Sequence, residues 1–323
     1  MSNNWNLSLD PKRIAVIKIW NAMMMGARDY VYEQGFTEVC NAPEIVSQTG
    51  ACENVDTLFK VDYFGRKAYL AQSDQLYIEL LTPQLKKVFA VIQSFRAEAE
   101  ADPRHLTQFS LFELELLGDL DDLIGAIAGT VKAMVDEVLE QCQDELKLLG
   151  RNPADLEDLC FTTIRYEEAV EMIKDVFPDL VFGDDLKSNH EAEVARRLGP
   201  VFITHYPEEI KFFNMKNNAE DPRVVNSTDL ILPFSGESTG ASERETNHDK
   251  LKEKLVKSAM YERLIQLGHT YEDFLWYLNA HKDKDIPLHS GCGIGMARVA
   301  QFIMGKEDIR ECVPFLLNSE NLL

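Results

Sequence analysis

Two stretches decide how this chain folds: Phe95-Arg96-Ala97-Glu98, continuing to Arg104-His105-Leu106-Thr107-Gln108-Phe109, and Ser290-Gly291-Cys292-Gly293-Ile294-Gly295-Met296-Ala297-Arg298. Around the first, residues 88–97 and 108–117 are apolar runs separated by a polar loop, which predicts a β-hairpin with an extended tip. In the second, spaced glycines lead into a helix predicted over 296–304, so they form a strand of bare backbone. Each stretch brings an arginine to a predicted antiparallel sheet.

The hairpin carries groups suited to holding a nucleotide. Arg96 and Glu98 alternate with apolar neighbours, so we expect both on one face of a strand, where the arginine bridges phosphate oxygens and the carboxylate accepts from an exocyclic amine. Arg104 and His105 occupy the tip, where they can meet outer phosphates. Phe109 begins the return strand and can stack on a base. A solvated hairpin with incidental charges is the alternative interpretation.

The glycine run is not a dinucleotide-binding loop. Its third glycine, Gly295, comes one residue too early for that fingerprint, and no acidic residue follows at the expected distance. A strand containing Gly291, Gly293 and Gly295 instead lets a flat ligand lie against bare backbone. Arg298, on the first turn of the following helix, is then expected to face the ligand's phosphates. The two stretches together predict an ATP site on an antiparallel sheet.

The remaining sequence predicts one α/β domain of the α+β type, an antiparallel sheet flanked by helices. No linker divides residues 1–323 into independent units. The Asp10-Pro11 pair starts the first helix and Gly35 ends it. Helices are predicted over 10–34, 74–81, 119–149, 167–176, 190–198, 250–267, 271–280 and 296–304, and strands over 36–46, 67–72, 88–97, 108–117, 201–205, 212–215 and 227–232.

Composition restricts the partners and the compartment. The net charge is −21, from 54 acidic and 33 basic residues, and such a surface opposes a polyphosphate backbone such as that of tRNA. The six cysteines include no Cys-x-x-Cys pair, which favours reduced thiols in a cytoplasmic protein over a disulfide framework or a structural zinc site. No apolar run approaches the roughly 20 residues that span a membrane, and the N-terminus does not read as an export signal.

Taken together, these motifs resemble the catalytic core of the class II aminoacyl-tRNA synthetases, and specifically the aspartyl/asparaginyl branch. Residues 95–98 and 104–109 are similar to that branch's motif 2, the glycines with Arg298 to motif 3, and the stretch around Pro43 to motif 1, an element that usually forms a dimer interface. The likeness runs from about residue 11 to residue 315. It implies a class II synthetase fold, ATP and Mg²⁺ as cofactors, catalytic roles for Arg96 and Arg298, and a homodimer.

The resemblance also implies an amino-acid pocket. Glu53 matches a mobile-loop glutamate that lies near the substrate's α-amino group. Gln72, Ser73 and Gln75 match a segment that lines the pocket. Arg244 matches the arginine that holds the substrate's side-chain carboxylate or amide, a suitable task for a bidentate guanidinium. A surface arginine within the cluster 243–245 is the alternative.

Other matching positions concern the metal and the choice of substrate. Asp229 and Glu237 match acidic positions that face the Mg²⁺–ATP phosphates. Glu113, in Phe112-Glu113-Leu114-Glu115, looks more like the Glu-x-Glu of asparaginyl enzymes than the Asp-x-Glu of aspartyl ones. It can accept a hydrogen bond from a carboxamide NH₂, which favours asparagine as a bound substrate or product. The other interpretation is that Glu113 is a structural carboxylate, or that it contacts a metal ligand rather than the substrate.

The chain also departs from the family's pattern. Ala297 stands where a glutamate usually precedes the motif 3 arginine, and Asn54-Val55 stand in place of the mobile loop's glycine pair. Asp74 replaces a proline in the pocket segment and adds a negative charge near the substrate. We also expect no N-terminal anticodon-binding barrel, which in the family is a small domain of roughly a hundred residues.

The expected absence of this barrel and the charge of −21 predict that tRNA is not a partner, whereas the retained motif residues predict that amino-acid activation is kept. One resembling enzyme is an asparagine synthetase related to aspartyl-tRNA synthetase, in which ammonia attacks an adenylated aspartate. Three hypotheses therefore stand. The first is an amide-forming ligase that uses aspartate or asparagine, ATP and ammonia. The second is an adenylating enzyme that transfers asparagine or aspartate to a small molecule, or that modifies such a residue in a peptide. The third is a non-catalytic paralogue that binds an amino acid or a nucleotide.

Overall fold

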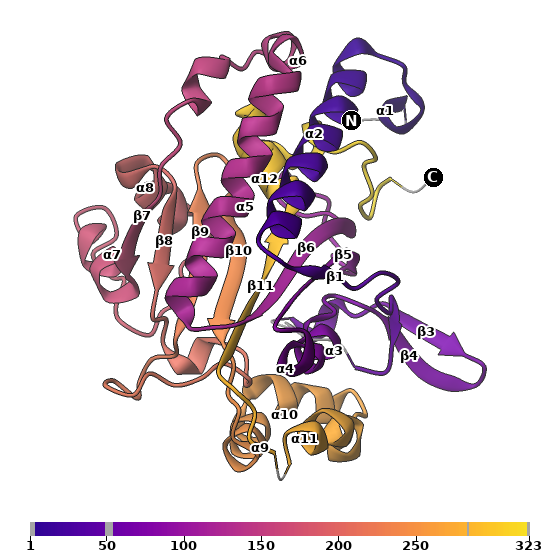
Figure 1. Ribbon diagram of the computed structural model, residues 1–323, viewed down its shortest axis with the longest axis vertical. Helices are drawn as coiled ribbons and strands as arrows, with labels where there is room; N and C mark the ends of the chain where they lie inside the picture. Colours follow the sequence, from indigo (N-terminus) through magenta and orange to yellow (C-terminus); the bar gives the residue numbers. More distant parts are fainter. Residues whose placement is uncertain (1–3, 49–53, 283, 322–323) are drawn as a thin grey trace.

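The computed structural model describes residues 4–48, 54–282 and 284–321. Its centre is an eight-stranded sheet in the order β1-β5-β6-β11-β10-β9-β8-β7 (Figure 1). The outermost pairs, β1–β5 and β7–β8, are parallel, and the other neighbours are antiparallel. The strands are β1 Thr37–Glu38, β5 Lys87–Phe95, β6 Gln108–Leu117, β11 His289–Gly295, β10 Gly236–Glu243, β9 Ser227–Leu232, β8 Val201–Thr204 and β7 Thr162–Arg165. The predicted fold class, a mainly antiparallel sheet flanked by helices, is confirmed.

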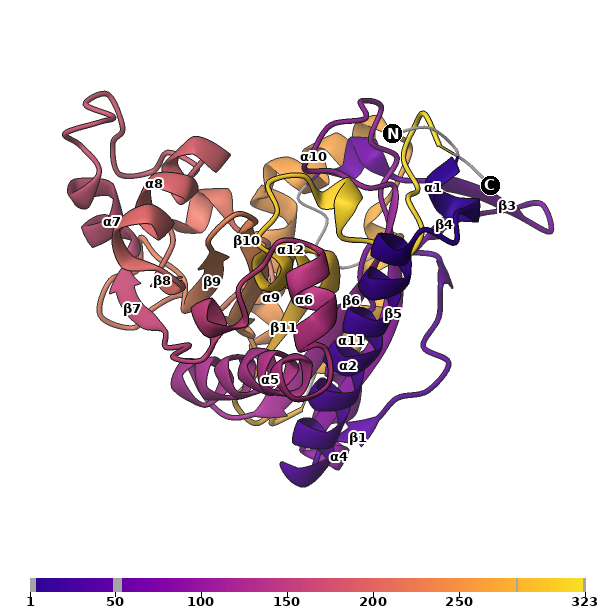
Figure 2. The ribbon, with the colours of Figure 1, turned by 90° about the horizontal axis from the view of Figure 1, so that it is seen from above.

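The two faces of the sheet have opposite chemistry because side chains alternate along each strand. One face carries Phe112, Leu114, Leu230 and Ile294, which belong to the main hydrophobic core. Two long helices, α2 (Pro11–Glu33) and α5 (Leu120–Gln141), supply the other half of that core and lie across this face (Figures 1 and 2). The opposite face carries the polar and glycine residues of the predicted site.

Local signals set the ends of these helices. The Asp10 side chain accepts from the Lys12 N–H and Pro11 occupies the first turn, as the sequence predicts. Asp119 and Asp122 form a reciprocal capping box at the start of α5. The predicted helix over 119–149 is, however, broken at Cys142, whose non-helical backbone separates α5 from α6 (Gln143–Leu148).

Smaller units surround the sheet. Helices α9 (His248–Lys257), α10 (Ala259–Gln266) and α11 (Leu275–His281) have a hydrophobic cluster of their own and lie below the sheet in Figure 1. A three-stranded sheet projects to one side. The remaining elements are β2 Ile45–Val46, β3 Lys60–Tyr63, β4 Arg66–Leu70, α1 Asn4–Leu7, α3 Gln75–Ile78, α4 Thr82–Leu85, α7 Tyr166–Met172, α8 Ser188–Leu198 and α12 Met296–Met304.

Several predicted elements are wrong for identifiable reasons. The strand over 36–46 is two short strands, β1 and β2, interrupted by Asn41 in the left-handed region and by Pro43. Residues 212–215 form a turn, since Phe212 and Phe213 are buried in the cluster of α9–α11 rather than in the sheet. The helix over 250–267 breaks at Ser258, whose extended backbone ends α9 and whose hydroxyl caps α10.

The hairpin has its predicted place but ends earlier than expected. Strand β5 stops at Phe95, so Arg96 and Glu98 lie beyond it and do not share a strand face. The Arg96 N–H still pairs with the Thr107 carbonyl at 2.9 Å, but the Ala97 N–H turns to Thr57 at 2.7 Å. In the described part of the chain, no helix is both long and apolar enough to cross a membrane.

The close approach of α2 and α5 yields a test of the packing. A Cβ at Gly26 of α2 would lie 2.3 Å from the backbone oxygen of Ala133 on α5, which cannot move aside cheaply. Gly26→Ala should therefore lower the free energy of unfolding by roughly 1–3 kcal/mol. Gly125→Ala, at an exposed site on α5 with nothing within 4 Å of the new Cβ, should instead raise it by about 0.5–1 kcal/mol. Urea denaturation measures the free energy of unfolding of both variants. Equal stabilities would contradict the close contact between Gly26 and the Ala133 backbone.

Candidate active site

The site is built on one row of residues that crosses four strands. Glu113 on β6 pairs with Gly293 on β11, Gly293 with Gly240 on β10, and Gly240 with Asp229 on β9. Directly paired residues in antiparallel strands share a face, so two carboxylates lie at the ends of a floor made of glycine. Three strand spacings give this floor a width of about 14 Å. That is room for a flat, extended ligand.

The glycines of β11 have different tasks. A Cβ at Gly293 would meet nothing closer than 3.8 Å, so this residue leaves the floor open. A Cβ at Gly291 would instead lie 2.0 Å from the carboxylate of Glu115, which already covers that backbone. Only part of the glycine strand is therefore available to a ligand. Its Gly291 end is filled by the protein's own side chain.

A cavity of about 320 Å³ lies over this floor. The predicted site residues that line it are Gln72, Ser73, Gln75, Arg96, Glu98, Arg104, His105, Phe109, Glu113, Glu237, Arg244, Gly293, Gly295 and Arg298. Asp229 is buried at the end of the row and is not among the residues that line the cavity. Glu53 lies outside the described residues. The chain thus brings together segments that are two hundred residues apart in sequence.

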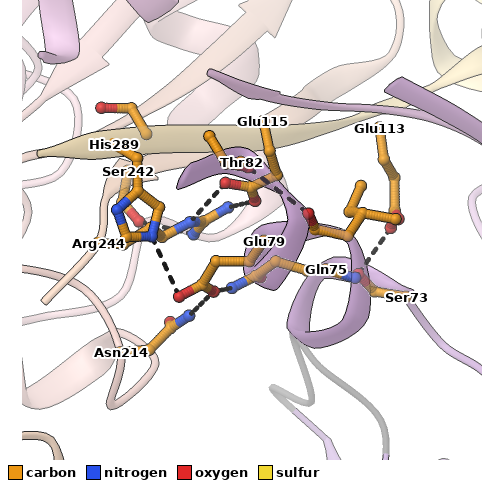
Figure 3. A network of polar contacts seen from close by, with 12 residues as sticks. Ser73, Gln75, Glu79, Thr82, Glu113, Glu115, Asn214, Ser242, Arg244 and His289 are labelled. Carbon is orange, nitrogen blue, oxygen red and sulfur yellow. Dashed lines mark hydrogen bonds and ion pairs between the residues drawn. The ribbon is translucent and has the colours of Figure 1, made fainter. Parts of the chain in front are cut away.

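At the end of the cavity where the sequence predicts an amino-acid pocket, Arg244 is already paired. Its Nη2 lies 2.6 Å from Glu115 Oε1 and its Nη1 donates to Ser242 Oγ at 2.9 Å (Figure 3). Both side chains of the ion pair are at most 3% exposed. Arg244 therefore reaches the cavity with its charge balanced by Glu115. The alternative of a surface arginine is wrong, because Arg244 is buried.

Glu113 faces the same end from β6. Its Oε1 accepts from Ser73 Oγ at 2.6 Å and its Oε2 from the Asp74 N–H at 3.1 Å. Burial raises the pKa of Glu113 to about 8, and nearby Asp74 and Glu115 add to the rise, while the two hydrogen bonds oppose it. A neutral Glu113 and a charged one are therefore both accessible near neutral pH.

A third buried carboxylate, Glu79, connects the segments at the base of this region. Its Oε1 lies 3.3 Å from His289 Nε2, and its Oε2 accepts from Asn214 Nδ2 at 3.2 Å (Figure 3). The same Oε1 also accepts from Tyr277 Oη at 2.7 Å. Hydrogen bonds from His281 and His289 outweigh burial and hold the pKa of Glu79 far below its ordinary value. The network joins α11, β11 and the segment before β5. The sequence offers no periodic signal for Glu79, and we did not predict it.

At the opposite end, three arginines surround the cavity. The Arg96 guanidinium lies over the Phe109 ring, 5.3 Å from its centroid. Arg298 lines the cavity, and it is held by the backbone: its Nη1 donates to the Ser235 carbonyl at 2.6 Å and its Nη2 to the Arg104 carbonyl at 2.8 Å. Burial, together with the neighbouring arginines, lowers the pKa of Arg298 to about 10. His105 is exposed and paired with Asp102 at 2.7 Å.

The predicted metal ligands meet over Gly240. A Cβ there would lie 3.4 Å from Glu237 Oε1 and 3.8 Å from Asp229 Oδ1, so both oxygens border one small open space. Asp229 Oδ2 is paired with Lys211 at 2.6 Å. Within the described ranges no three His, Cys, Asp or Glu residues converge as a metal cage. Mg²⁺ usually takes only one or two carboxylates together with phosphates and water, so these two residues fit it.

Sequence reasoning missed one further carboxylate, Glu191 on α8. It lines the cavity and is only 6% exposed, and its Oε2 accepts from the Glu237 N–H at 3.1 Å. The sequence does contain a signal that could have identified Glu191. Glu191 occupies the same helix face as Val194, Ala195 and Leu198, which pack in a hydrophobic cluster. A carboxylate on an apolar stripe is costly unless it has a buried partner.

Comparisons with known proteins agree with this geometry. The sequence model of the family described as tRNA synthetases class II (D, K and N) matches residues 3–319. The chain belongs to this family. It is 34% identical over 306 residues to the asparagine–tRNA ligase of Thermoplasma acidophilum, covering 93% of this chain and 68% of that protein. It is 36% identical over 310 residues to that of Pelotomaculum thermopropionicum, covering 94% and 69%.

Solved structures give the same result. An asparaginyl-tRNA synthetase from Pyrococcus horikoshii, complexed with asparaginyl-adenylate, superposes with a TM-score of 0.86 at 33% identity, over 97% of this chain and 70% of that one. One from Entamoeba histolytica, also with asparaginyl-adenylate, gives 0.81 at 28% identity, over 96% and 68%. The chain is thus a class II synthetase catalytic core, an adenylate-forming ligase of a family that uses ATP.

Asp74 of this synthetase core allows a test of the pocket's electrostatics. The side chain is fully buried, and neither carboxylate oxygen has a hydrogen-bond partner among the described residues. Burial, and then nearby Glu44, raises its pKa to about 7. An unfolded aspartate titrates near pH 3.9, so between roughly pH 4 and 7 the folded protein holds a proton that the unfolded chain releases, and stability falls as pH rises.

Asp74→Asn should remove this loss of stability at high pH. The variant should melt roughly 2–6 °C above the parent at pH 8, and the gain should vanish toward pH 4. Asp29→Asn, at an exposed aspartate on α2, is the control and should show no such pH-dependent gain. Differential scanning calorimetry across this pH range measures both. A gain at pH 8 that persists unchanged at pH 4 would show that Asp74 is not a buried, titrating carboxyl.

Proposed function

We propose that this synthetase core joins asparagine to ATP as asparaginyl-adenylate, with asparagine preferred over aspartate. The observation that carries the proposal is the charge at the amino-acid end. Arg244 is already neutralised by Glu115, and the carboxyl of Glu113 faces the cavity beside it. A neutral carboxamide suits this setting, since its oxygen can accept from Arg244 and its NH₂ can donate to Glu113. The bound adenylates of the two solved relatives support the same choice.

The reaction needs no protein nucleophile. The substrate's carboxylate oxygen attacks the α-phosphorus of ATP, the new oxygen–phosphorus bond forms, and the bond to the bridging oxygen breaks as pyrophosphate leaves. Arg96 is placed to offset the charge that develops on phosphorus, and Phe109 beneath it can carry the adenine ring. Mg²⁺, held by Glu237 and Asp229, would neutralise phosphate oxygens. Gly293 and Gly240 let the ligand lie close to the sheet.

A second candidate is the amide-forming reaction with aspartate and ammonia. One observation favours it: the pKa of Glu113 is raised to about 8 and that of Asp74 to about 7. When protonated, these carboxyls no longer repel an aspartate carboxylate, and when ionised Glu113, which lines the cavity, can take a proton as ammonia attacks the adenylate and AMP leaves. Transfer of an asparaginyl group to a small molecule, a peptide or tRNA would follow from the first candidate.

Isotope exchange between pyrophosphate and ATP tests the activation step. We expect exchange with asparagine and a kcat/KM at least about tenfold lower with aspartate, which would place an extra charge beside Glu113. Mass spectrometry with ammonium present, using aspartate, identifies any asparagine formed. Asparagine synthesis from aspartate would replace the first candidate by the second, and no exchange with either amino acid would refute both.

Arg96→Ala tests the assigned chemistry. Removing a group that stabilises charge in the transition state should lower kcat for exchange by roughly 10²–10³-fold. Arg66→Ala makes the same chemical change at the exposed first residue of β4, outside the cavity, and should leave the rate unchanged. Equal rates for Arg96→Ala and the parent would remove Arg96 from the mechanism.

The expected homodimer is also a proposal. On α2, Ile14, Met25 and Tyr32 are 37%, 42% and 50% exposed. Their spacings of 11 and 7 residues place them on one helix face, which supports burial by a second copy of this chain. Light scattering after size exclusion should give twice the mass of the 323-residue chain, and Met25→Glu should lower it to one chain. A monomer for the parent at micromolar concentration would contradict the proposal.

A further inference from the structure

Glu191 occupies a position that links three parts of the site. It lies on α8, which packs beside β8 and is remote from both arginine stretches in sequence (Figure 2). Its Oε2 accepts from the Glu237 N–H at 3.1 Å and lies 3.5 Å from Arg104 Nη2. One carboxylate oxygen thus contacts the backbone of a predicted metal ligand and the side chain of a predicted phosphate ligand.

The turn between β9 and β10 is shaped around this oxygen. Gly236 has φ +70°, a conformation that favours glycine, and a Cβ there would lie 2.4 Å from Glu191 Oε2. The absence of a side chain at Gly236 is therefore what lets the carboxylate reach the turn. The Glu237 N–H follows directly, so the turn and Glu191 fix where the Glu237 side chain begins.

Arg298 closes the arrangement into a ring. It donates to the carbonyl of Ser235 in the same turn and to the carbonyl of Arg104, while the Arg104 side chain returns to Glu191. The ring joins α8, α12, the β9–β10 turn and the hairpin loop. None of these contacts involves the amino-acid end of the cavity, where Glu113 and Arg244 lie.

Charge gives the ring a second role. Arg96 and Arg104 both lower the pKa of Arg298, so the three guanidinium groups repel one another before any phosphate arrives. Glu191 and Glu237 are the carboxylates that oppose this effect. Loss of the Glu191 charge would leave Arg104 without its counter-charge, and Arg104 would then sample positions away from the cavity.

We propose that Glu191 is a positioning residue for the nucleotide: through Arg104 and the Glu237 backbone it sets the affinity for Mg²⁺–ATP and leaves amino-acid binding untouched. This inference rests on the proposed function, because it assigns Arg104 and Glu237 to ATP. It extends that function by giving the α8 segment a direct part in nucleotide binding. It also predicts that a change in Glu191 affects nucleotide binding and not amino-acid binding, because the ring contacts only one end of the site.

Glu191→Gln is the informative variant, because its amide oxygen can still accept from Glu237 while the charge opposite Arg104 is lost. Glu193→Gln is the matched control: it removes a carboxylate from the same helix, but one that faces Arg196 and Arg197 near the surface. Pyrophosphate exchange is measured against Mg²⁺–ATP and against asparagine. We expect KM for Mg²⁺–ATP to rise about tenfold in Glu191→Gln, with KM for asparagine and the melting temperature close to those of Glu193→Gln.

Two results would overturn the proposal. One is an unchanged KM for Mg²⁺–ATP in Glu191→Gln. The other is an equal rise in both KM values together with a lower melting temperature, which marks a general structural role. Calorimetric titration with a non-hydrolysable ATP analogue and Mg²⁺ supplies a readout without turnover. If the parent binds the analogue but shows no exchange, the proposed function fails while the titration still decides the role of Glu191.

Arg104→Ala keeps the proposal testable if Glu191→Gln does not fold, since it breaks the same link without altering α8. It should weaken analogue binding by a similar factor. In a double variant, Glu191→Gln should add little to Arg104→Ala if the carboxylate acts through this arginine. Independent, multiplying losses in the double variant would show that Glu191 does not act through Arg104.

Discussion

The buried ion pair between Glu115 and Arg244 is the interaction on which the rest of the site depends. It links Glu115 on β6 to Arg244, the residue directly after β10, across β11, and its 2.6 Å contact is possible because the intervening residue is Gly291. Any side chain at that position would occupy the place of the carboxylate. Removing one partner of such a pair leaves an uncompensated buried charge, at a cost of roughly 3–5 kcal/mol. The ion pair therefore requires glycine at position 291 of β11, and it also requires the register that aligns this residue with its neighbours on β6 and β10.

The same pair determines what the cavity can recognise. An arginine without a counter-charge would favour a carboxylate, whereas Arg244 next to Glu115 presents hydrogen-bond donors with little net charge. Glu79 extends this balance, because it lies within electrostatic reach of both Arg244 and Glu115 and is itself held by His289 and Tyr277. The proposed specificity for a carboxamide would thus arise from the surroundings of the arginine more than from the arginine itself.

How far the sequence predicted this structure depends on the kind of signal involved. Strong periodic or capping signals gave the hairpin, the helix that begins at Pro11 and the antiparallel sheet. Strand β10 was missed because Gly236–Glu243 is rich in glycine, serine and threonine and carries no apolar alternation. It is recognisable as a strand only when the neighbours that bury it are known. The end of β5 was misplaced for a related reason: the Ala97 N–H bonds to Thr57, a partner outside the hairpin.

The residues of the site divide in the same way. Arg96, Arg298 and the glycines stand in local patterns, and the structure places the two arginines with Gly293 and Gly295 in one cavity. Glu115 and Glu79 act through partners more than 120 residues away in sequence, and no local pattern reveals such pairings. Asp229 illustrates the limit from the other side: the resemblance assigned it to the Mg²⁺–ATP phosphates, which stays a prediction, but its pairing with Lys211 was not foreseen.

We expect the distribution of charge to favour the binding of short polyanions over long ones. Arg96, Arg104 and Arg298 line one cavity in a chain of net charge −21. At physiological ionic strength an exposed charge is screened beyond about 8 Å, so a ligand feels mainly the charges it approaches closely. The triphosphate of ATP is short enough to remain among the three arginines. A nucleic-acid backbone is longer than the cluster, and in a chain of net charge −21 we expect few of its phosphates to meet a lysine or arginine that would release counterions. The prediction that tRNA is not a partner rests on this difference in length between the two polyanions.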